Sequence, residues 1–212
     1  MMTGKLITFE GLDRCGKSVQ IERLIARFEA EQISFTFLRE PGGTVIAEKI
    51  RQTLLTKEQE IMSPDTEYLL YSAARAQLVK EKIIPSLDQG MLVISDRYYD
   101  SSTAYQGYGR DIDLKLIQRI NHFATNGIKP DLSFLIDIDV DEMERRKKLM
   151  NKKLDRIEDQ NRTFFEKVRS GYLKIVEQEP ERFYVINGKK SIDSISAEIW
   201  DQVTRKIIKI EY

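Results

Sequence analysis

The chain has 212 residues, enough to bury a full hydrophobic core, and we expect one domain over residues 1–212. Its 34 basic and 34 acidic residues balance, which argues against nucleic acid or an anionic membrane surface as a partner. The one cysteine, Cys15, excludes an intramolecular disulfide. We find no secretion signal and no run of about 20 apolar residues, so we expect a cytoplasmic protein.

Short apolar runs alternate along the chain with segments of helical periodicity. Strands are predicted at residues 6–9, 34–38, 91–95, 132–138 and 183–186. Helices are predicted at about residues 17–31, 44–56, 65–84, 113–125, 160–177 and 191–207. Because this alternation is typical of α/β proteins, we expect a three-layer fold with a five-stranded parallel sheet and helices on both faces.

Residues 11–18 have the pattern G-x-x-x-x-G-K-S, directly after the first predicted strand and before the first predicted helix. Such a loop surrounds nucleotide phosphates with backbone N–H groups, next to the positive end of the helix. Lys17 would bring a charge to the β- and γ-phosphates, and the Ser18 hydroxyl would bind Mg²⁺. The residues predicted to bind a nucleoside triphosphate are Gly11, Leu12, Asp13, Arg14, Cys15, Gly16, Lys17 and Ser18.

Each later strand is also followed by polar residues. Arg39–Thr44 follow the second strand, Asp96–Tyr98 the third, Asp137–Asp139 the fourth and Asn187–Lys189 the fifth. Ligands of open α/β sheets bind at the carboxyl ends of the strands, so these clusters predict one shared site there.

Several of these residues suit phosphoryl transfer, but each has a plainer interpretation. Asp96 would lie near Mg²⁺ and Arg97 between two phosphates, or the two would form an ion pair that caps the strand. Arg14 could reach over the γ-phosphate as an arginine finger, or point to solvent. Asp13 would repel phosphates, which favours a contact with a sugar hydroxyl or a role at the helix N-terminus.

Tyr71 and Arg75 lie one turn apart on a predicted helix, where a ring and a guanidinium can stack on a base and bind its carbonyl. A tyrosine at this spacing more often belongs to the core, and Arg75 more often pairs with Glu67 or Asp65.

The main basic cluster, residues 144–158, is typical of a solvated helical face. Within it, Arg156 could clamp phosphates when the segment closes as a lid.

Together these stretches resemble the thymidylate kinase family over nearly the whole chain. The resemblance rests on residues 9–18, 39–44, 69–75, 96–98, 101–107, 129–131 and 154–158. The Tyr-Gln-Gly and Asp-Arg-Ile-Glu stretches narrow it from P-loop kinases in general to this family. The resemblance implies a P-loop kinase fold with a lid at about residues 143–158. It implies transfer of the γ-phosphoryl of ATP-Mg²⁺ to dTMP, for dTTP synthesis and DNA replication. It also implies a homodimer formed through helices flanking the sheet.

The resemblance also implies a base pocket. Tyr71 stands where an aromatic residue stacks on thymine, and Arg75 where an arginine donates to O4. An arginine there selects thymine or uracil. In cytosine an amine replaces the O4 carbonyl, and its N–H groups would meet the N–H groups of the guanidinium with no acceptor between them. Ser102 and Gln106 match residues lining the pocket, and Tyr105 matches the ring under the sugar, which favours the deoxy form.

At the remaining matching positions the resemblance implies polar contacts with the acceptor. Asp13 takes the 3′-hydroxyl of dTMP, while Asp96 organises Mg²⁺ and its waters. Arg39, Arg51 and Arg97 hold the phosphate of dTMP.

Family members take their catalytic arginine either from the phosphate loop or from the lid. Arg14 fits the first group, whereas residues 39–44 look like the second, and Lys152 and Lys153 replace an arginine-glycine pair of the lid. We expect Arg14 to supply the transition-state charge and the lid mainly to exclude water. The predicted catalytic residues are Arg14, Lys17, Asp96 and Arg97, and Arg156 is predicted to bind ATP.

Two other functions stay open on the sequence. A deoxynucleoside kinase shares the phosphate loop and the Asp-Arg pair but needs a carboxylate base for a 5′-hydroxyl, and Glu40 could serve. A nucleotide-binding switch would hydrolyse slowly and signal by shape, yet we see no segment suited to sense a γ-phosphate.

Overall fold

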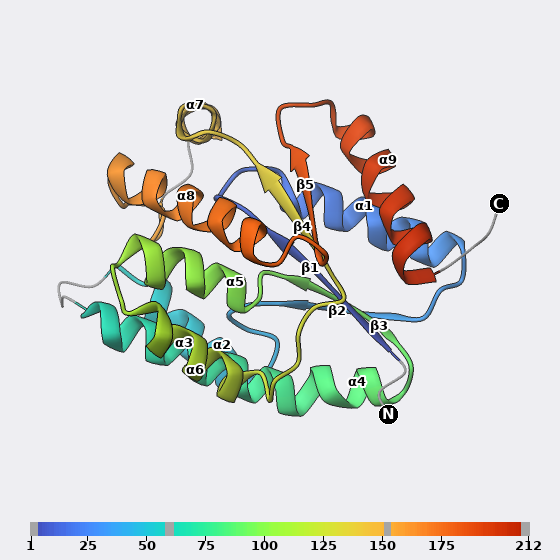
Figure 1. The fold of residues 1–212 in the computed structure, drawn as a ribbon, viewed down its shortest axis with the longest axis horizontal. Helices are drawn as coiled ribbons and strands as arrows, with labels where there is room; N and C mark the ends of the chain where they lie inside the picture. The colour runs from blue at the N-terminus through green and yellow to red at the C-terminus, as the bar shows by residue number, and fades with distance from the viewer. Residues whose placement is uncertain (1–3, 58–61, 151–153, 209–212) are drawn as a thin grey trace.

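A central sheet of five parallel strands, in the order β2-β3-β1-β4-β5, organises the computed structural model (Figure 1). The structure describes residues 4–57, 62–150 and 154–208. The strands are β1 (Lys5–Glu10), β2 (Phe35–Arg39), β3 (Leu92–Asp96), β4 (Leu132–Asp137) and β5 (Phe183–Asn187). All five predicted strands, and the parallel sheet expected from their alternation with helices, are confirmed.

Helices cover both faces of this sheet, as predicted. The helices are α1 (Lys17–Ala30), α2 (Val45–Leu55), α3 (Pro64–Leu78), α4 (Ile84–Asp88), α5 (Tyr99–Ser102), α6 (Leu114–Ala124), α7 (Val140–Met150), α8 (Arg162–Gln178) and α9 (Ile192–Val203). On one side of the sheet lie α1 and α9, and on the other lie α2, α3, α5, α6 and α8 (Figure 1). Leu6 and Ile7, neighbours on β1, point to opposite faces and are both fully buried, because the central strands are covered twice.

Three helical regions differ from the prediction. The helix predicted at 191–207 is α-helical over α9 and π-helical over Thr204–Ile208. The helix predicted at 65–84 is interrupted by a π-helical segment, Val79–Ile83, directly before α4. Pro85 in α4 lacks the N–H that a continuous helix would donate to the carbonyl of Glu81, so the hydrogen-bond pattern widens there. The segment after β3, for which no helix was predicted, forms α5 and a further π-helical segment, Thr103–Gly109.

Within the basic stretch 144–158, α7 is described as far as Met150, and turns lie within residues 156–159. Lys152 and Lys153, which entered the prediction of the lid, lie outside the described residues. No helix in the described ranges is long and apolar enough to cross a membrane.

Candidate active site

The loop between β1 and α1 has the backbone that the glycine pattern predicts. Gly11 (φ 134°) and Gly16 (φ 107°) both adopt left-handed conformations, and Gly16 stands directly before α1. A Cβ on Gly11 would lie 2.5 Å from the carbonyl oxygen of Ile136, so only glycine lets the loop run this close to the end of β4. Lys17 folds back over the loop, and its Nζ donates to the carbonyl oxygens of Gly11 (3.1 Å) and Leu12 (3.0 Å).

Arg97, just after β3, is held directly against this loop. Its guanidinium donates to Asp13 Oδ1 at 2.6 Å and to the carbonyl oxygen of Gly11 at 3.0 Å. The Tyr105 hydroxyl donates to the other oxygen of Asp13 at 3.1 Å. Burial alone would raise the pKa of Asp13, but the charges of Arg97 and Lys17 outweigh it and hold that pKa below its ordinary value. Asp13 is therefore an ionised hydrogen-bond acceptor at neutral pH.

Asp96 has the features of a cation ligand. Its Oδ1 is buried and has no hydrogen-bond partner among the described residues. A buried carboxylate oxygen without a donor is costly, and a bound cation or its water would satisfy it. Mg²⁺ is commonly held by one or two protein oxygens together with substrate phosphates, so Asp96, with Ser18 at the start of α1, fits that ion.

A pocket opens beside the phosphate loop at the carboxyl ends of the strands. It brings together all but one of the residues predicted for dTMP, namely Asp13, Arg51, Tyr71, Arg75, Arg97, Ser102, Tyr105 and Gln106. Its wall is completed by Glu40, Pro41, Leu55, Tyr98, Ser101, Asp155 and Ile157. Burial raises the pKa of Tyr71, so this tyrosine presents a neutral hydroxyl near the pocket.

Arg75 is buried in this wall, and its partner is neither of the two acidic residues expected on the sequence. Its Nε donates to Glu40 Oε2 at 2.7 Å, and Nη2 donates to Ser102 Oγ at 3.0 Å. Burial raises the pKa of Glu40, and the charge of Arg75 only partly offsets that rise. The two side chains form a buried ion pair that links β2 to α3.

Three predicted arginines are paired with carboxylates. Arg39 is outside the pocket, exposed, and paired with Glu48 at 3.1 Å. Arg14 pairs with Glu158, and its Nη2 is 3.2 Å from Glu158 Oε1. Arg156 turns toward α3, and its Nη1 is 2.6 Å from Glu67 Oε2.

A local turn at Asp155 explains why Glu158 reaches Arg14 and why Arg156 reaches Glu67. Asp155 Oδ1 accepts the N–H groups of both Ile157 and Glu158 at 2.8 Å. This turn sends Glu158 toward the phosphate loop and Arg156 toward the pocket wall.

Sequence reasoning missed Glu10 as a member of the site. This fully buried residue ends β1 and accepts from the N–H of Tyr98 (2.8 Å), Ser101 Oγ (2.6 Å) and the Tyr172 hydroxyl (3.1 Å). Arg97 also donates to the hydroxyl oxygens of Ser101 and Tyr172, so Glu10 supports Arg97 through these two hydroxyl groups. A charged residue at the end of an apolar strand was the signal that could have identified it.

Arg146 was also missed. Its Nη1 donates to the carbonyl oxygens of Arg14 (3.2 Å) and Cys15 (3.1 Å), and its Nη2 to that of Gly188 (2.7 Å). Its place in a run of basic residues gave no sign that it differs from its neighbours.

Burial and the charge of Asp100 raise the pKa of Glu10 from 4.5 to about 7. The neutral Glu10 carboxyl therefore favours the folded state. Its contribution to the free energy of unfolding is fully present below pH 4.5 and is lost as the pH rises through 7, because ionisation of the buried group is unfavourable. We expect the Glu10→Gln variant to lack a fall of about 2–3 kcal/mol in the free energy of unfolding between pH 5 and 8. Urea denaturation across this pH range measures the difference, with Glu29→Gln on the exposed face of α1 as the control. Parallel pH profiles for Glu10→Gln and the wild type would contradict the assignment.

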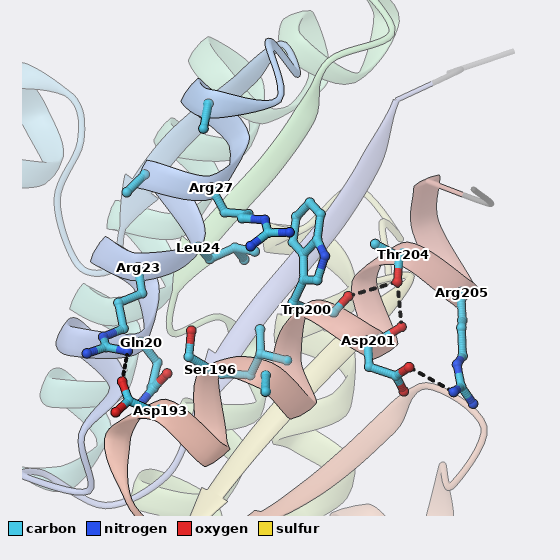
Figure 2. A pocket seen from close by; sticks show the side chains of 14 residues that line it. Gln20, Arg23, Leu24, Arg27, Asp193, Ser196, Trp200, Asp201, Thr204 and Arg205 are labelled. Atoms are coloured by element: carbon cyan, nitrogen blue, oxygen red, sulfur yellow. Dashed lines mark hydrogen bonds and ion pairs between the residues drawn. The ribbon is translucent and has the colours of Figure 1, made fainter. Parts of the chain in front are cut away.

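A larger groove, of about 970 Å³, lies between α1 and α9 on the other side of the sheet (Figure 2). Its charged side chains already have partners: Arg23 pairs with Asp193 and Arg205 with Asp201, while Arg27 lies over the Trp200 ring, 4.6 Å from its centroid. The smaller pocket, about 110 Å³, is the one beside the phosphate loop. We therefore place the candidate active site there, since chemistry and not size distinguishes the two.

Comparison with known proteins agrees with this site. A family model described as thymidylate kinase matches residues 9–199. The thymidylate kinase of Caldanaerobacter subterraneus subsp. tengcongensis is 46% identical over 191 residues, which cover 90% of each chain. That of Lactobacillus acidophilus is 42% identical over 211 residues, covering 98% of this chain and 97% of the relative. The crystal structure of thymidylate kinase from Ehrlichia chaffeensis superposes with a TM-score of 0.77 at 33% identity, over 94% of this chain and 98% of the other. The chain therefore belongs to the thymidylate kinase family.

Proposed function

We propose that this chain transfers the γ-phosphoryl group of ATP to dTMP, giving dTDP and ADP, the reaction of the thymidylate kinase family. The observation that carries the proposal is the adjacency of two sites, a phosphate loop and a pocket lined by Tyr71 and Arg75. Arg97 joins the two sites, because it contacts the loop and also lines the pocket.

ATP is proposed to bind through the loop from Gly11 to Ser18. Lys17 would exchange the carbonyl oxygens that it now contacts for phosphate oxygens, which carry more negative charge. Asp96 and Ser18 would hold Mg²⁺, which supplies charge neutralisation on the phosphates when bound. Arg156 is not assigned to ATP in this proposal, because its guanidinium faces Glu67.

The acceptor is proposed to lie in the pocket with its base against Tyr71. Arg75 would donate to the ring carbonyl, and Tyr105 would lie under the sugar. Arg51 and Arg97 would hold the phosphate, whereas Arg39 is left out because Glu48 holds it outside the pocket. No general base is needed, since the attacking phosphate oxygen is already an anion, and catalysis consists of positioning and charge neutralisation.

A panel of nucleoside monophosphates and thymidine, each with ATP-Mg²⁺, tests this function directly. We expect dTMP to be the preferred acceptor and thymidine to be inert. Glu40 is a poor candidate for the base that a deoxynucleoside kinase requires, because it is buried and paired with Arg75. Faster turnover of thymidine than of dTMP would reverse this conclusion, and no transfer to any monophosphate would favour a switch.

The segment at about 143–158 is proposed to act as a lid within a single domain. Asp155 and Ile157 line the pocket, the N–H of Arg156 donates to the carbonyl oxygen of Leu55, and Lys57 pairs with Asp159 at 2.8 Å. These contacts join the segment to the end of α2, so its opening would admit ligand and its closure would exclude water.

A homodimer and a cytoplasmic location complete the proposal. The use of a single cysteine, Cys15, suits a reducing compartment. Large apolar side chains stay exposed on α3 and α6, at Leu69, Leu116 and Phe123. Phe123 and Ala73 line the same surface groove together with polar residues, so the two helices offer one surface with an exposed aromatic ring that a second copy could cover.

We expect Phe123→Glu to convert the dimer to a monomer, since the charge would be buried in the apolar contact. Phe123 is the most exposed of the three, at 79%. Light scattering should give the mass of two chains for the wild type and of one for the variant. Ile192→Glu, which changes an exposed apolar residue of α9, is the control and should remain dimeric. A dimeric Phe123→Glu protein would exclude this surface.

A further inference from the structure

A buried carboxylate that the proposed reaction does not use lies behind the pocket. Glu67 of α3 is 1% exposed. Its Oε1 accepts from Gln106 Nε2 at 2.8 Å, and its Oε2 accepts from Arg156 Nη1 at 2.6 Å. Arg110 bridges both oxygens, at 3.3 and 3.1 Å. Three separate segments therefore meet on one side chain: α3, the π-helical segment with the residue that follows it, and the lid.

The carboxylate decides which way the Gln106 amide faces. An ionised carboxylate only accepts hydrogen bonds, so the NH₂ group of Gln106 must turn to Glu67. The carbonyl oxygen Oε1 of Gln106 is then left for the pocket that this residue lines. The two arginines on Glu67 stabilise its charge despite burial, which makes this orientation the favourable one.

The second oxygen of Glu67 holds the lid. Arg156 reaches it while its Nε donates to the carbonyl oxygen of Leu54 at 2.9 Å. The neighbours of Arg156 in the chain, Asp155 and Ile157, form part of the pocket wall. One carboxylate thus connects the orientation of the Gln106 amide with the docking of the lid.

We propose that Glu67 is a positioning residue that makes Gln106 present an acceptor to the pyrimidine base and docks the lid segment over it. The ring nitrogen N3 of thymine and uracil carries a hydrogen, whereas N3 of cytosine is an acceptor. A hydrogen-bond acceptor held at this place in the pocket can accept from N3 of thymine or uracil, whereas it would face the N3 acceptor of cytosine without a hydrogen between them. The inference rests on the proposed function, because it requires the base to lie in this pocket.

Glu67→Gln tests the proposal because it should reverse the orientation of the Gln106 amide. The new side chain keeps its oxygen toward the two guanidinium groups and turns its NH₂ to Gln106, which then rotates and offers its own NH₂ to the pocket. We expect the ratio of kcat/KM for dTMP over dCMP to fall by about tenfold or more, mainly through KM for dTMP. A residue that served only the fold would lower both values together and leave the ratio unchanged.

Two further variants make the test specific. Glu81→Gln removes an exposed carboxylate in the π-helical segment that follows α3, and we expect it to keep the wild-type ratio. Gln106→Ala removes the amide, so Glu67→Gln should have no additional effect on the ratio in that background. Additive effects of the two substitutions would overturn the proposal.

The outcomes separate this inference from the proposed function. If Gln106→Ala weakens discrimination but Glu67→Gln does not, the base lies in the pocket and Glu67 does not orient the amide. If neither variant changes KM for dTMP, the base lies elsewhere and the proposed placement fails.

If Glu67→Gln does not fold, the wild-type protein provides the measurement. We expect the side-chain NH₂ protons of Gln106 to exchange with water at least about tenfold more slowly than those of exposed Gln118, because they are bonded to a buried carboxylate. Exchange at equal rates would overturn the proposal.

Discussion

The Arg14→Ala variant is expected to transfer phosphate to dTMP with a kcat about 10³-fold lower or more, and to bind dTMP almost unchanged. Losses of this size follow when an arginine finger is removed from a phosphoryl-transfer enzyme, because its charge is needed mainly in the transition state. Arg14 is suited to this role because it is part of the loop itself and its side chain is only 7% exposed. Its partner Glu158 would yield the guanidinium to the γ-phosphate in the reacting complex.

Steady-state kinetics with calorimetry of dTMP binding checks the Arg14 prediction. Arg145→Ala is the matched control, since this α7 arginine is exposed and paired with Glu142. We expect the control to keep wild-type turnover. An Arg14→Ala enzyme that works within tenfold of the wild type would assign the transition-state charge to another residue.

Replacing Arg75 with methionine should lower the free energy of unfolding by about 3–5 kcal/mol, because it leaves the charge of Glu40 buried without its partner. It should also weaken dTMP binding by about 1–3 kcal/mol, the cost of a lost hydrogen bond to a carbonyl. Because burial already raises the pKa of Glu40, the loss of stability should be smaller at pH 5 than at pH 8. Urea denaturation and calorimetry measure the two effects.

A double variant separates the fold from binding at this position. Arg75→Met with Glu40→Gln removes both charges, so stability should recover in large part while dTMP affinity stays low. Wild-type affinity in the double variant would show that Arg75 does not contact the base. A single variant as stable as the wild type would show that the buried pair contributes nothing.

Local patterns were sufficient for the strands and for the phosphate loop. An apolar run such as residues 132–138 can only be a buried strand or helix segment, and its short length selects the strand. The glycines at 11 and 16 determine the turn from β1 into α1 because few other residues adopt their backbone angles. The rule that ligands bind at the carboxyl ends of strands predicted Arg97 near the loop, where it contacts Gly11. Tyr105, which the family resemblance implied, contacts Asp13 of the same loop.

The carboxylate partner of each of these arginines could not be predicted from local sequence patterns. Arg75 meets Glu40, 35 residues away, whereas the prediction considered only acidic residues within its own helix. Arg156 meets Glu67 across 89 residues, and Arg14 meets Glu158 across 144. The sequence also gave no order for the strands.

The sequence by itself determined the strands and the phosphate loop, because each depends on neighbours within a few positions. Most pocket residues were implied by the resemblance to the thymidylate kinase family, which the sequence also carries. Only the tertiary structure decided which carboxylate each arginine meets. The strand order β2-β3-β1-β4-β5 and the turn at Asp155 set those distances. A guanidinium on a long side chain can reach many carboxylates, and the one it selects depends on which segments the fold buries together.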